Sequence, residues 1–295
     1  MQLRSKADDA EVEKLVGKLP KAGDFPVVLS DSGTVYKPNG ERLLTMVRGG
    51  ISEAAAEAAY PFFHSIRKQT AKNRGNFSGE PRYQYIKKDG KASGTNFAKE
   101  VASCVLGSLD RFPPRTAFCR QTYITRDDPE GWKSCWAFIQ DAARCFEREV
   151  PKRYAAQLEA AQKTHPAYVI PGTPFTTATV NNCTQGGYHR DAGDYKPGFG
   201  VMPVLRRGSY RGCLLGFPAY GVAVDLQDRD LILFDPHEVH GNTPYEDAIG
   251  PKGEPDKGGY ERISVVLYFR SKMTECLSPT EELTRIKAHR GAIDT

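Results

Sequence analysis

Three side chains in the second half of the chain have the types and the spacing of a metal site. His189 and Asp191 stand two positions apart, and His240 follows further along the chain. Alternate residues of a strand point to the same face, so a strand through 189–191 presents the first two side chains to one ion. Two histidines and one carboxylate on one face of a metal are typical of non-haem Fe(II) oxygenases, which keep the opposite positions open. The three residues therefore predict a catalytic iron site.

The distal histidine of this set has an alternative. His237 and His240 both lie in the segment 235–242. We favour His240 as the ligand, because it follows a run of β character and because Gly241 lets the backbone approach a metal closely. His237 is the rival ligand for the same position.

An oxygenase of this class also needs a position for O₂ and a cosubstrate that supplies electrons, which is usually 2-oxoglutarate. The far carboxylate of 2-oxoglutarate requires a fixed cation, and the planar guanidinium of arginine pairs with a carboxylate through two hydrogen bonds. Arg262 opens the last predicted strand, and Ser264 lies two positions on, at the same face. We predict that Arg262 and Ser264 bind this carboxylate and that Asn182 contributes to the cosubstrate site.

The elements that must position these residues change in character after Pro171 and Gly172. Before this point we expect helices over 8–18, 53–69, 96–107, 130–149 and 151–162, with strands near 27–29, 34–36, 43–47 and 119–124. After it we expect strands over 175–180, 189–191, 200–205, 212–217, 221–225, 231–234 and 262–269. Short β-rich runs at this spacing predict a double-stranded β-helix, or jelly roll, within an α+β fold.

The sequence predicts one domain over residues 1–295. Residues 1–170 are expected to form mainly helical support with short strands, and residues 171–275 the jelly-roll core with the metal site. Residues 276–295 are expected to form a C-terminal helix, because Ser278 and Glu281 have the spacing of a capping box. Gly291 is expected to end that helix.

Composition is that of an ordinary globular protein, with 39% hydrophobic and 26% charged residues. No run approaches the roughly 20 apolar residues of a membrane-spanning helix, and the first residues lack the apolar core of a secretory signal. We therefore expect a cytoplasmic or nucleic-acid-associated protein, with no membrane contact and no protein partner inferred. The seven cysteines, none spaced as C-x-x-C, predict reduced and mostly buried thiols.

Basic residues gather in one part of the chain. The net charge is only +5, but nine Lys or Arg lie between residues 67 and 99, among glycines and the aromatic residues Tyr83 and Tyr85. Such a segment is suited to following a phosphate backbone. The alternative interpretation is a solvated face or loop without a partner.

Further residues around the predicted ligands carry a resemblance to a known family. The likeness covers mainly residues 70–270, and its main elements are the runs 175–182, 189–194, 199–200, 217–218, 222–225 and 240–242, together with Asn73-Arg74-Gly75. These elements resemble the TET and base-J-binding-protein family of dioxygenases. The resemblance implies a double-stranded β-helix with Fe(II), 2-oxoglutarate and O₂, and it places the iron ligands on His189, Asp191 and His240 and the cosubstrate arginine on Arg262.

The substrate that the resemblance implies is a 5-methylpyrimidine in DNA. The reaction is then hydroxylation of thymine to 5-hydroxymethyluracil or of 5-methylcytosine to 5-hydroxymethylcytosine. Because the methyl group lies inside the duplex, we expect the nucleotide to flip into the pocket. The candidates for contacts with it are Asn73, Arg74, Asn181, Tyr188, Asp194 and Tyr195.

The chain departs from its relatives in its length. It has no room for the cysteine-rich module of the animal TET enzymes or for the extra DNA-reading domain of the base J proteins, so we expect the compact domain itself to recognise DNA. A catalytic domain of this size suits a phage or microbial modification enzyme. Two alternatives share the predicted site: an oxygenase of the same chemistry acting on a small molecule or a protein side chain, and a binding module without turnover.

Overall fold

The strands form two main sheets that pack face to face. The computed structural model describes residues 1–71, 74–79, 84, 86–92, 99–111, 118–247 and 259–293. The larger sheet has the order β2-β3-β12-β8-β15-β7-β5-β4, with β6 beside β5, and the smaller has the order β1-β11-β10-β13. Phe217 of the smaller sheet packs against Phe234 of the larger, with 5.9 Å between ring centroids. This arrangement confirms the predicted jelly roll.

Most of the predicted β runs contain a strand, although several bounds differ. The larger sheet contains β2 (Gly33–Tyr36), β3 (Arg42–Val47), β4 (Thr70–Ala71), β5 (Val101–Leu109), β6 (Arg120–Gln121), β7 (Thr177–Asn182), β8 (Gly200–Arg207), β12 (Leu231–Phe234) and β15 (Glu261–Tyr268). The smaller sheet contains β1 (Val27–Leu29), β10 (Leu215–Phe217), β11 (Val222–Val224) and β13 (Gly241–Asn242). A separate pair joins β9 (Tyr210–Gly212) to β14 (Tyr245–Asp247).

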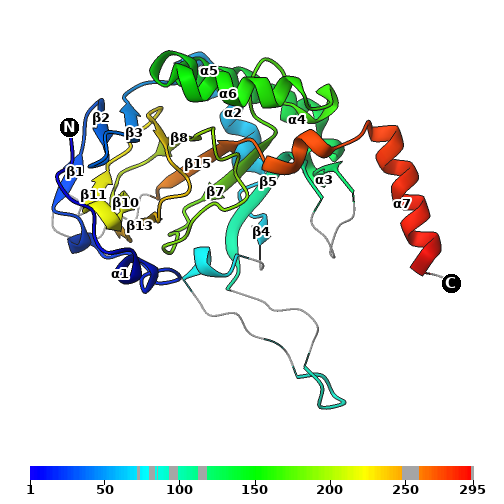
Figure 1. The fold of residues 1–295 in the computed structure, drawn as a ribbon, viewed down its shortest axis with the longest axis horizontal. Helices are drawn as coiled ribbons and strands as arrows, with labels where there is room; N and C mark the ends of the chain where they lie inside the picture. The colour runs from blue at the N-terminus through cyan, green and yellow to red at the C-terminus, as the bar shows by residue number, and fades with distance from the viewer. Residues whose placement is uncertain are drawn as a thin grey trace.

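Helices cover the outer face of the larger sheet (Figure 1). They are α2 (Glu53–Ser65), α4 (Pro129–Ser134), α5 (Trp136–Glu149) and α6 (Pro151–Gln162). The hydroxyl of Ser52 caps α2 by accepting a hydrogen bond from the backbone of Ala55. In α5, Ile139, Ala142 and Phe146 recur at helical spacing and are buried against the sheet. No helix in the described part of the chain is both long and apolar enough to cross a bilayer.

The remaining helical elements are short, apart from α7. They are α1 (Asp9–Glu13), α3 (Tyr123–Asp127), α7 (Pro279–Ile293) and the 3₁₀ turns η1 (Ala22–Asp24), η2 (Asn76–Ser78), η3 (Pro166–Tyr168), η4 (Pro218–Tyr220) and η5 (Ser271–Glu275). The capping box predicted for α7 is present, because the Ser278 backbone donates to the Glu281 carboxylate and the Glu281 backbone donates to the Ser278 hydroxyl.

The central strand β15 separates the helix-covered core from the interior between the sheets. It pairs antiparallel with β7 on one side and with β8 on the other. Ile263, Val265 and Leu267 are buried in the core beneath the helices. Because side chains alternate along a strand, Arg262 and Ser264 face the opposite side, between the two sheets. One strand thus carries both core residues and predicted site residues.

One predicted helix is a strand. The sequence predicts a helix over 96–107, but Val101–Leu109 forms β5, which pairs antiparallel with β7; residues 93–98 lie outside the described part. The prediction is wrong because pairing with β7 overrides the local preference. Gly107 allows this pairing, since its φ is +79° and a Cβ there would lie 2.5 Å from the carbonyl oxygen of Thr176. The N-terminal half therefore contributes several strands to the larger sheet in addition to helical support.

Other helix boundaries differ from the predicted ones. The helix predicted over 8–18 ends at Glu13, and the helix predicted over 130–149 is divided at Cys135 into α4 and α5. The run 119–124 is only partly strand, because α3 begins at Tyr123. Gly291 does not end α7, which continues to Ile293. Periodicity identifies the buried face of a helix but leaves its ends poorly defined.

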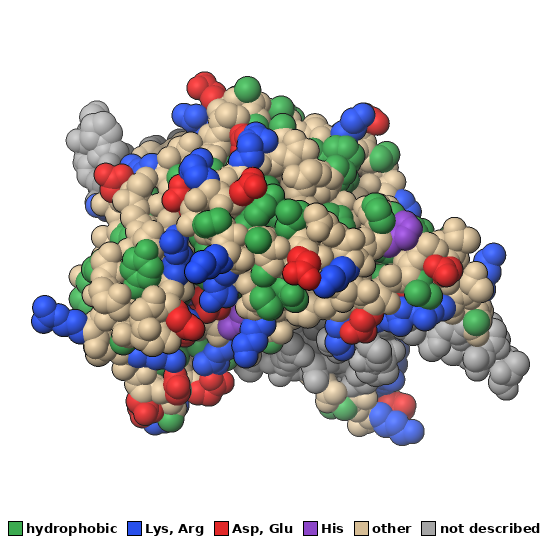
Figure 2. Space-filling view, turned by 45° about the horizontal axis from the view of Figure 1, so that its top comes forward, with side chains coloured by type: hydrophobic (Ala, Val, Ile, Leu, Met, Phe, Trp, Pro, Cys, Tyr) green, Lys and Arg blue, Asp and Glu red, His purple; other side chains and the backbone are tan. Residues whose placement is uncertain are grey.

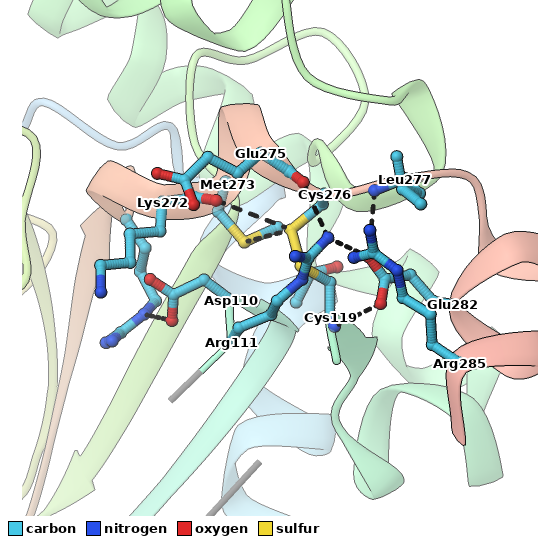
Figure 3. The surroundings of a disulfide bond; sticks show 12 residues. Asp110, Arg111, Cys119, Lys272, Met273, Glu275, Cys276, Leu277, Glu282 and Arg285 are labelled. Atoms are coloured by element: carbon cyan, nitrogen blue, oxygen red, sulfur yellow. Dashed lines mark hydrogen bonds and ion pairs between the residues drawn. A yellow bond between two sulfur atoms is a disulfide. The ribbon is translucent and has the colours of Figure 1, made fainter. Parts of the chain in front are cut away.

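A disulfide bond joins Cys119 to Cys276 and attaches the start of α7 to the body (Figure 3). Beside it, the carboxylate of Glu282 accepts hydrogen bonds from the backbone N–H groups of Cys119 (3.2 Å) and Leu277 (3.0 Å). The same carboxylate pairs with Arg111 at 3.0 Å. The prediction of reduced thiols is therefore wrong for this pair, which 157 residues of sequence separate.

The first testable prediction concerns this bond. Denatured but unreduced protein should show five alkylatable thiols, the free cysteines 104, 135, 145, 183 and 213. Replacing both bonded cysteines (Cys119→Ser with Cys276→Ser) should lower the free energy of unfolding by about 2–4 kcal/mol, because the bond limits the unfolded chain. Thiol counting by mass spectrometry and urea unfolding measure the two quantities. Seven thiols in the unreduced wild-type chain would contradict the assignment.

Candidate metal centre

His189, Asp191 and His240 converge on one point between the sheets. His189 Nε2 lies 3.6 Å from Asp191 Oδ1, and His240 Nε2 lies 3.5 Å from Asp191 Oδ2. One donor atom from each residue lies within 4.8 Å of the other two. Donors that share one ion at about 2.1 Å are themselves roughly 3–3.5 Å apart. The three side chains therefore have the separations that a shared metal ion requires.

Each imidazole is held so that its Nε2 lone pair is available. His189 Nδ1 lies 2.8 Å from the carbonyl oxygen of Gly187, and His240 Nδ1 lies 2.9 Å from that of Glu238. A carbonyl oxygen can only accept, so Nδ1 carries the proton in both rings and Nε2 is left as a donor to a metal.

The backbone brings the two histidines together without a regular strand. His189 and His240 exchange both N–H···O bonds, at 2.9 and 3.0 Å, as an isolated antiparallel bridge. The N–H of Asp191 donates to the carbonyl oxygen of Pro236 at 2.9 Å. The strand predicted over 189–191 is thus replaced by this single bridge, while the predicted placement of His189 and Asp191 on one side is confirmed. Gly187 permits the close approach, since a Cβ there would lie 2.6 Å from the carbonyl oxygen of Asn76.

The charges of the site suit metal binding at neutral pH. Loss of hydration, followed by the nearby His240, lowers the pKa of His189 to about 4. Burial opposes ionisation of Asp191, but the neighbouring imidazoles of His240 and His189 outweigh burial and lower its pKa. His189 is therefore neutral and Asp191 ionised, as metal ligands must be.

A cavity of about 220 Å³ opens beside the three ligands. Both sheets contribute to its wall: Thr179, Asn181, Met202, Phe234, Ser264, Val266 and Tyr268 come from the larger sheet, and Leu215 and Asn242 from the smaller. Arg74, Phe77, Asp194 and Arg270 complete most of the lining. The cavity adjoins the metal ligands, so a bound organic molecule can approach an ion held there.

Several polar atoms around this site are buried without a hydrogen-bond partner. Those of residues lining the cavity are Arg74 Nε, Asn181 Oδ1, Asp194 Oδ2 and Asn242 Nδ2. Burying a polar group without a partner costs free energy, so unpaired groups gathered at one cavity indicate a polar ligand. Burial and the neighbouring charge of Asp191 raise the pKa of Asp194 well above its ordinary value, which favours the protonated form of this carboxyl group.

Arg262 is a buried cation beside unpaired phenols. It is 3% exposed, and no carboxylate pairs with it within the described ranges. Tyr210 and Tyr245 lie next to its guanidinium, with 5.4 Å between their ring centroids. Arg262 Nη2 and both phenol oxygens are buried without a partner of hydrogen-bond geometry. This group of donors is suited to an anion, and a carboxylate matches it.

Three predicted substrate-contact residues line the cavity, and two tyrosines of the set do not. Arg74, Asn181 and Asp194 are part of its wall. Tyr188 is buried in the core and donates to Asp24 at 3.0 Å, and Tyr195 packs on Phe269 with 5.6 Å between ring centroids. The structure therefore does not support contacts from these two tyrosines, because packing uses both rings elsewhere. Asn73 lies outside the described residues.

Two other candidates also lie away from the cavity. Asn182 follows Asn181 on β7, so its side chain points to the opposite face, where it donates to Glu261 at 2.7 Å. This position does not support its predicted contact with the cosubstrate. His237, the rival ligand, lies 3.4 Å from Asp235 instead of at the metal point. Ser264, by contrast, lines the cavity as predicted.

Sequence reasoning missed four residues of the site. Phe77 packs edge-on against His189 with 5.1 Å between ring centroids, and the guanidinium of the predicted residue Arg74 lies 4.2 Å from the centroid of the Phe77 ring. Asn242 and Arg270 line the cavity, and Tyr245 lies beside Arg262. A signal was present for Asn242, which stands two positions after His240. Tyr245 and Phe77 lie in segments whose place in the fold no periodicity indicates.

The second prediction tests the ligand set. His189→Ala and Asp191→Ala should each abolish stoichiometric binding of Mn(II) or Fe(II), because each removes one of three donors. His237→Ala tests the rival ligand and should weaken binding far less than the other two variants, since its imidazole lies beside Asp235 instead of at the metal point. Anaerobic calorimetric titration measures all three variants. Loss of binding in His237→Ala with retention in a His240→Ala variant would reverse the assignment.

Sequence relatives cover most of this chain but only a fraction of their own length. The chain is 28% identical over 259 residues to a protein named thymine dioxygenase JBP1 from Leishmania tarentolae, a match that covers 87% of this chain and 28% of that protein. It is 33% identical over 187 residues to the protein of the same name from Trypanosoma brucei brucei, covering 63% of this chain and 21% of that one. The chain thus spans less than a third of the length of either relative.

Structural comparison and family comparison agree with these relatives. A solved structure described as NgTET1 in complex with 5mC DNA has a TM-score of 0.54 at 10% identity, covering 96% of this chain and 100% of that chain, and so has a similar fold. Residues 110–271 match the Tet_JBP family, described as the oxygenase domain of the 2OGFeDO superfamily. The matched range includes His189, Asp191, His240 and Arg262, and this chain belongs to the Tet_JBP family.

Proposed function

We propose that this chain is an Fe(II)- and 2-oxoglutarate-dependent dioxygenase domain that hydroxylates the 5-methyl group of a pyrimidine base in DNA. The convergence of His189, Asp191 and His240 beside a cavity with unpaired polar groups carries this proposal. With iron and 2-oxoglutarate bound, such a site uses O₂ to place one oxygen atom in a C–H bond while the cosubstrate becomes succinate and carbon dioxide.

The residues present fit both groups. His189, Asp191 and His240 are the three ligands of the ion, with both imidazoles held by carbonyl oxygens at Nδ1. Arg262 binds the far carboxylate of 2-oxoglutarate, supported by Tyr245 and by Ser264 on the same face of β15. The buried unpaired Nη2 of Arg262 supports this role, because a carboxylate satisfies it.

The flipped base is recognised by the cavity's unpaired groups. Asn181 Oδ1 is a hydrogen-bond acceptor, and the carboxyl group of Asp194, whose pKa burial raises, donates when it is protonated. The Watson–Crick edges of thymine and of 5-methylcytosine each offer an N–H donor beside an acceptor, which these two groups complement. The sequence relatives named thymine dioxygenases favour thymine as the first substrate to test.

The DNA is expected to approach the cavity side of the molecule. Figure 2 views the molecule with the helical layer brought towards the reader. Basic and acidic side chains are interspersed over the face it shows. On α5 and α6, Arg148 pairs with Glu149 at 2.8 Å and Lys163 with Glu159 at 2.6 Å, so these cations are locally neutralised. Arg74 at the cavity has no carboxylate partner among the described residues, which leaves its charge available to a nucleotide.

The third prediction is the activity itself. The protein, supplied with Fe(II), ascorbate, 2-oxoglutarate and DNA, should form a hydroxymethylated nucleoside that mass spectrometry detects after digestion. Parallel reactions with unmodified DNA and with 5-methylcytosine-containing DNA distinguish 5-hydroxymethyluracil from 5-hydroxymethylcytosine. DNA binding should weaken as salt rises, because phosphate contacts release counterions. Turnover of 2-oxoglutarate with no base product on either DNA would refute the proposed substrate.

The fourth prediction concerns the cosubstrate. Tyr245→Phe removes one hydroxyl beside Arg262 and should raise the KM for 2-oxoglutarate about tenfold or more with little change in kcat, since a hydrogen bond to a charged group contributes about 1.5–3 kcal/mol. Tyr195→Phe is the control, because Tyr195 lies outside the cavity. An unchanged KM in Tyr245→Phe would remove Tyr245 from the cosubstrate site.

A further inference from the structure

A buried lysine holds the turn that carries His240. Lys37 follows β2 directly and is 7% exposed. Its Nζ lies 2.8 Å from Asp235 Oδ2 and 2.8 Å from Glu238 Oε1. Both carboxylates belong to the turn 235–238, which connects β12 to His240 and β13. One ammonium group therefore joins two points of the same turn to the β2–β3 hairpin.

Backbone carbonyl groups of the turn 235–238 accept hydrogen bonds from two of the three proposed metal ligands. The carbonyl oxygen of Glu238 accepts the Nδ1 proton of His240 at 2.9 Å. The carbonyl oxygen of Pro236 accepts the N–H of Asp191 at 2.9 Å. The direction of the His240 ring and the position of Asp191 thus both depend on where residues 236–238 lie.

The charges of Lys37, Asp235 and Glu238 stabilise one another in a partly buried place. Burial opposes the charged form of Lys37, but hydrogen bonds with Asp235 and Glu238 outweigh it and raise the pKa of the ammonium. Tyr220 donates to Glu238 at 2.9 Å, and the backbone N–H of Asp235 donates to Leu43 at 3.0 Å. Without the ammonium of Lys37, the two half-buried carboxylates of this turn would lose the positive charge that stabilises them. We therefore expect the turn to rearrange.

We propose that Lys37 is a positioning residue of the metal centre, which sets the metal affinity by fixing the turn 235–238. The inference rests on the iron site of the proposed function. It assigns a role in that site to a residue of the N-terminal hairpin that lies about two hundred positions before the ligand it orients. Partners that orient metal ligands typically change metal affinity by about 10- to 100-fold when they are removed.

Metal titration of the intact chain tests this fifth prediction. Mn(II) is added anaerobically to wild-type protein and to Lys37→Met, Lys37→Arg and Lys6→Met, and free Mn(II) is measured by electron paramagnetic resonance. Lys37→Met should raise the Kd by about 10- to 100-fold, and Lys37→Arg, which keeps the cation, should raise it less. Lys6→Met is the control, because Lys6 lies 3.9 Å from Glu238 and is more exposed than Lys37. Circular dichroism and the thermal midpoint of the metal-free proteins show whether each variant is folded.

The outcomes separate this inference from the proposed function. Folded Lys37→Met with the wild-type Kd overturns the role of Lys37. If Lys37→Met does not fold, Glu238→Gln is measured instead; it keeps the Lys37–Asp235 pair and should still weaken Mn(II) binding, and an unchanged Kd overturns the role. A wild-type chain that binds no Mn(II) overturns the iron site itself.

Discussion

Two backbone hydrogen bonds between His189 and His240 are the constraint on which the site depends. They form an isolated bridge next to β13 and bring the two imidazole rings to 4.4 Å between centroids. The segment before His189 is fixed by further backbone bonds, since Gly187 donates to Phe77 and Tyr188 donates to Lys18, each at 2.8 Å. The N-terminal residues and the turn η2 therefore have a structural role at the metal site, although neither supplies a ligand.

The strand β15 connects the hydrophobic core to the proposed cosubstrate site. Its apolar residues are buried beneath the helices, while Arg262 and Ser264 point between the sheets. Glu261, at the start of the strand, accepts hydrogen bonds from Tyr60 (2.6 Å) and Asn182 (2.7 Å) and lies 2.9 Å from His64 Nδ1. Helix α2 thus fixes the position of the residue next to Arg262. The buried guanidinium of Arg262 therefore lies on a strand that is paired on both sides.

Local patterns in the sequence predicted those strands and helices whose apolar residues recur with a regular period. Alternation identified β15 and placed Arg262 with Ser264, and helical spacing identified the buried face of α5. The ligands were identifiable because two histidines and an aspartate at this spacing have few structural alternatives. The same reasoning could not place Asn182, which contacts Glu261, since β7 has polar residues on both faces and composition alone does not say which face meets the cavity.

Long-range relations account for the rest of what the sequence could not predict. The bond between Cys119 and Cys276, the pairing of β5 with β7 and the contact of Lys37 with Asp235 join residues that are far apart in the chain. Each depends on the packed structure and leaves no periodic signal. For Tyr188, position next to a predicted ligand was misleading. Its ring is buried in the core, because the backbone bridge at His189 directs the Tyr188 side chain away from the cavity.

Transfer of an oxygen atom from O₂ to a DNA base tests the central claim most directly. The reaction is run under ¹⁸O₂ in ordinary water with DNA as substrate, and the hydroxymethylated nucleoside and succinate are quantified by mass spectrometry. The account predicts ¹⁸O in the new hydroxymethyl group and one succinate for each group formed. A product that carries oxygen from water, or DNA that remains unmodified while the metal-loaded protein consumes 2-oxoglutarate, would contradict it.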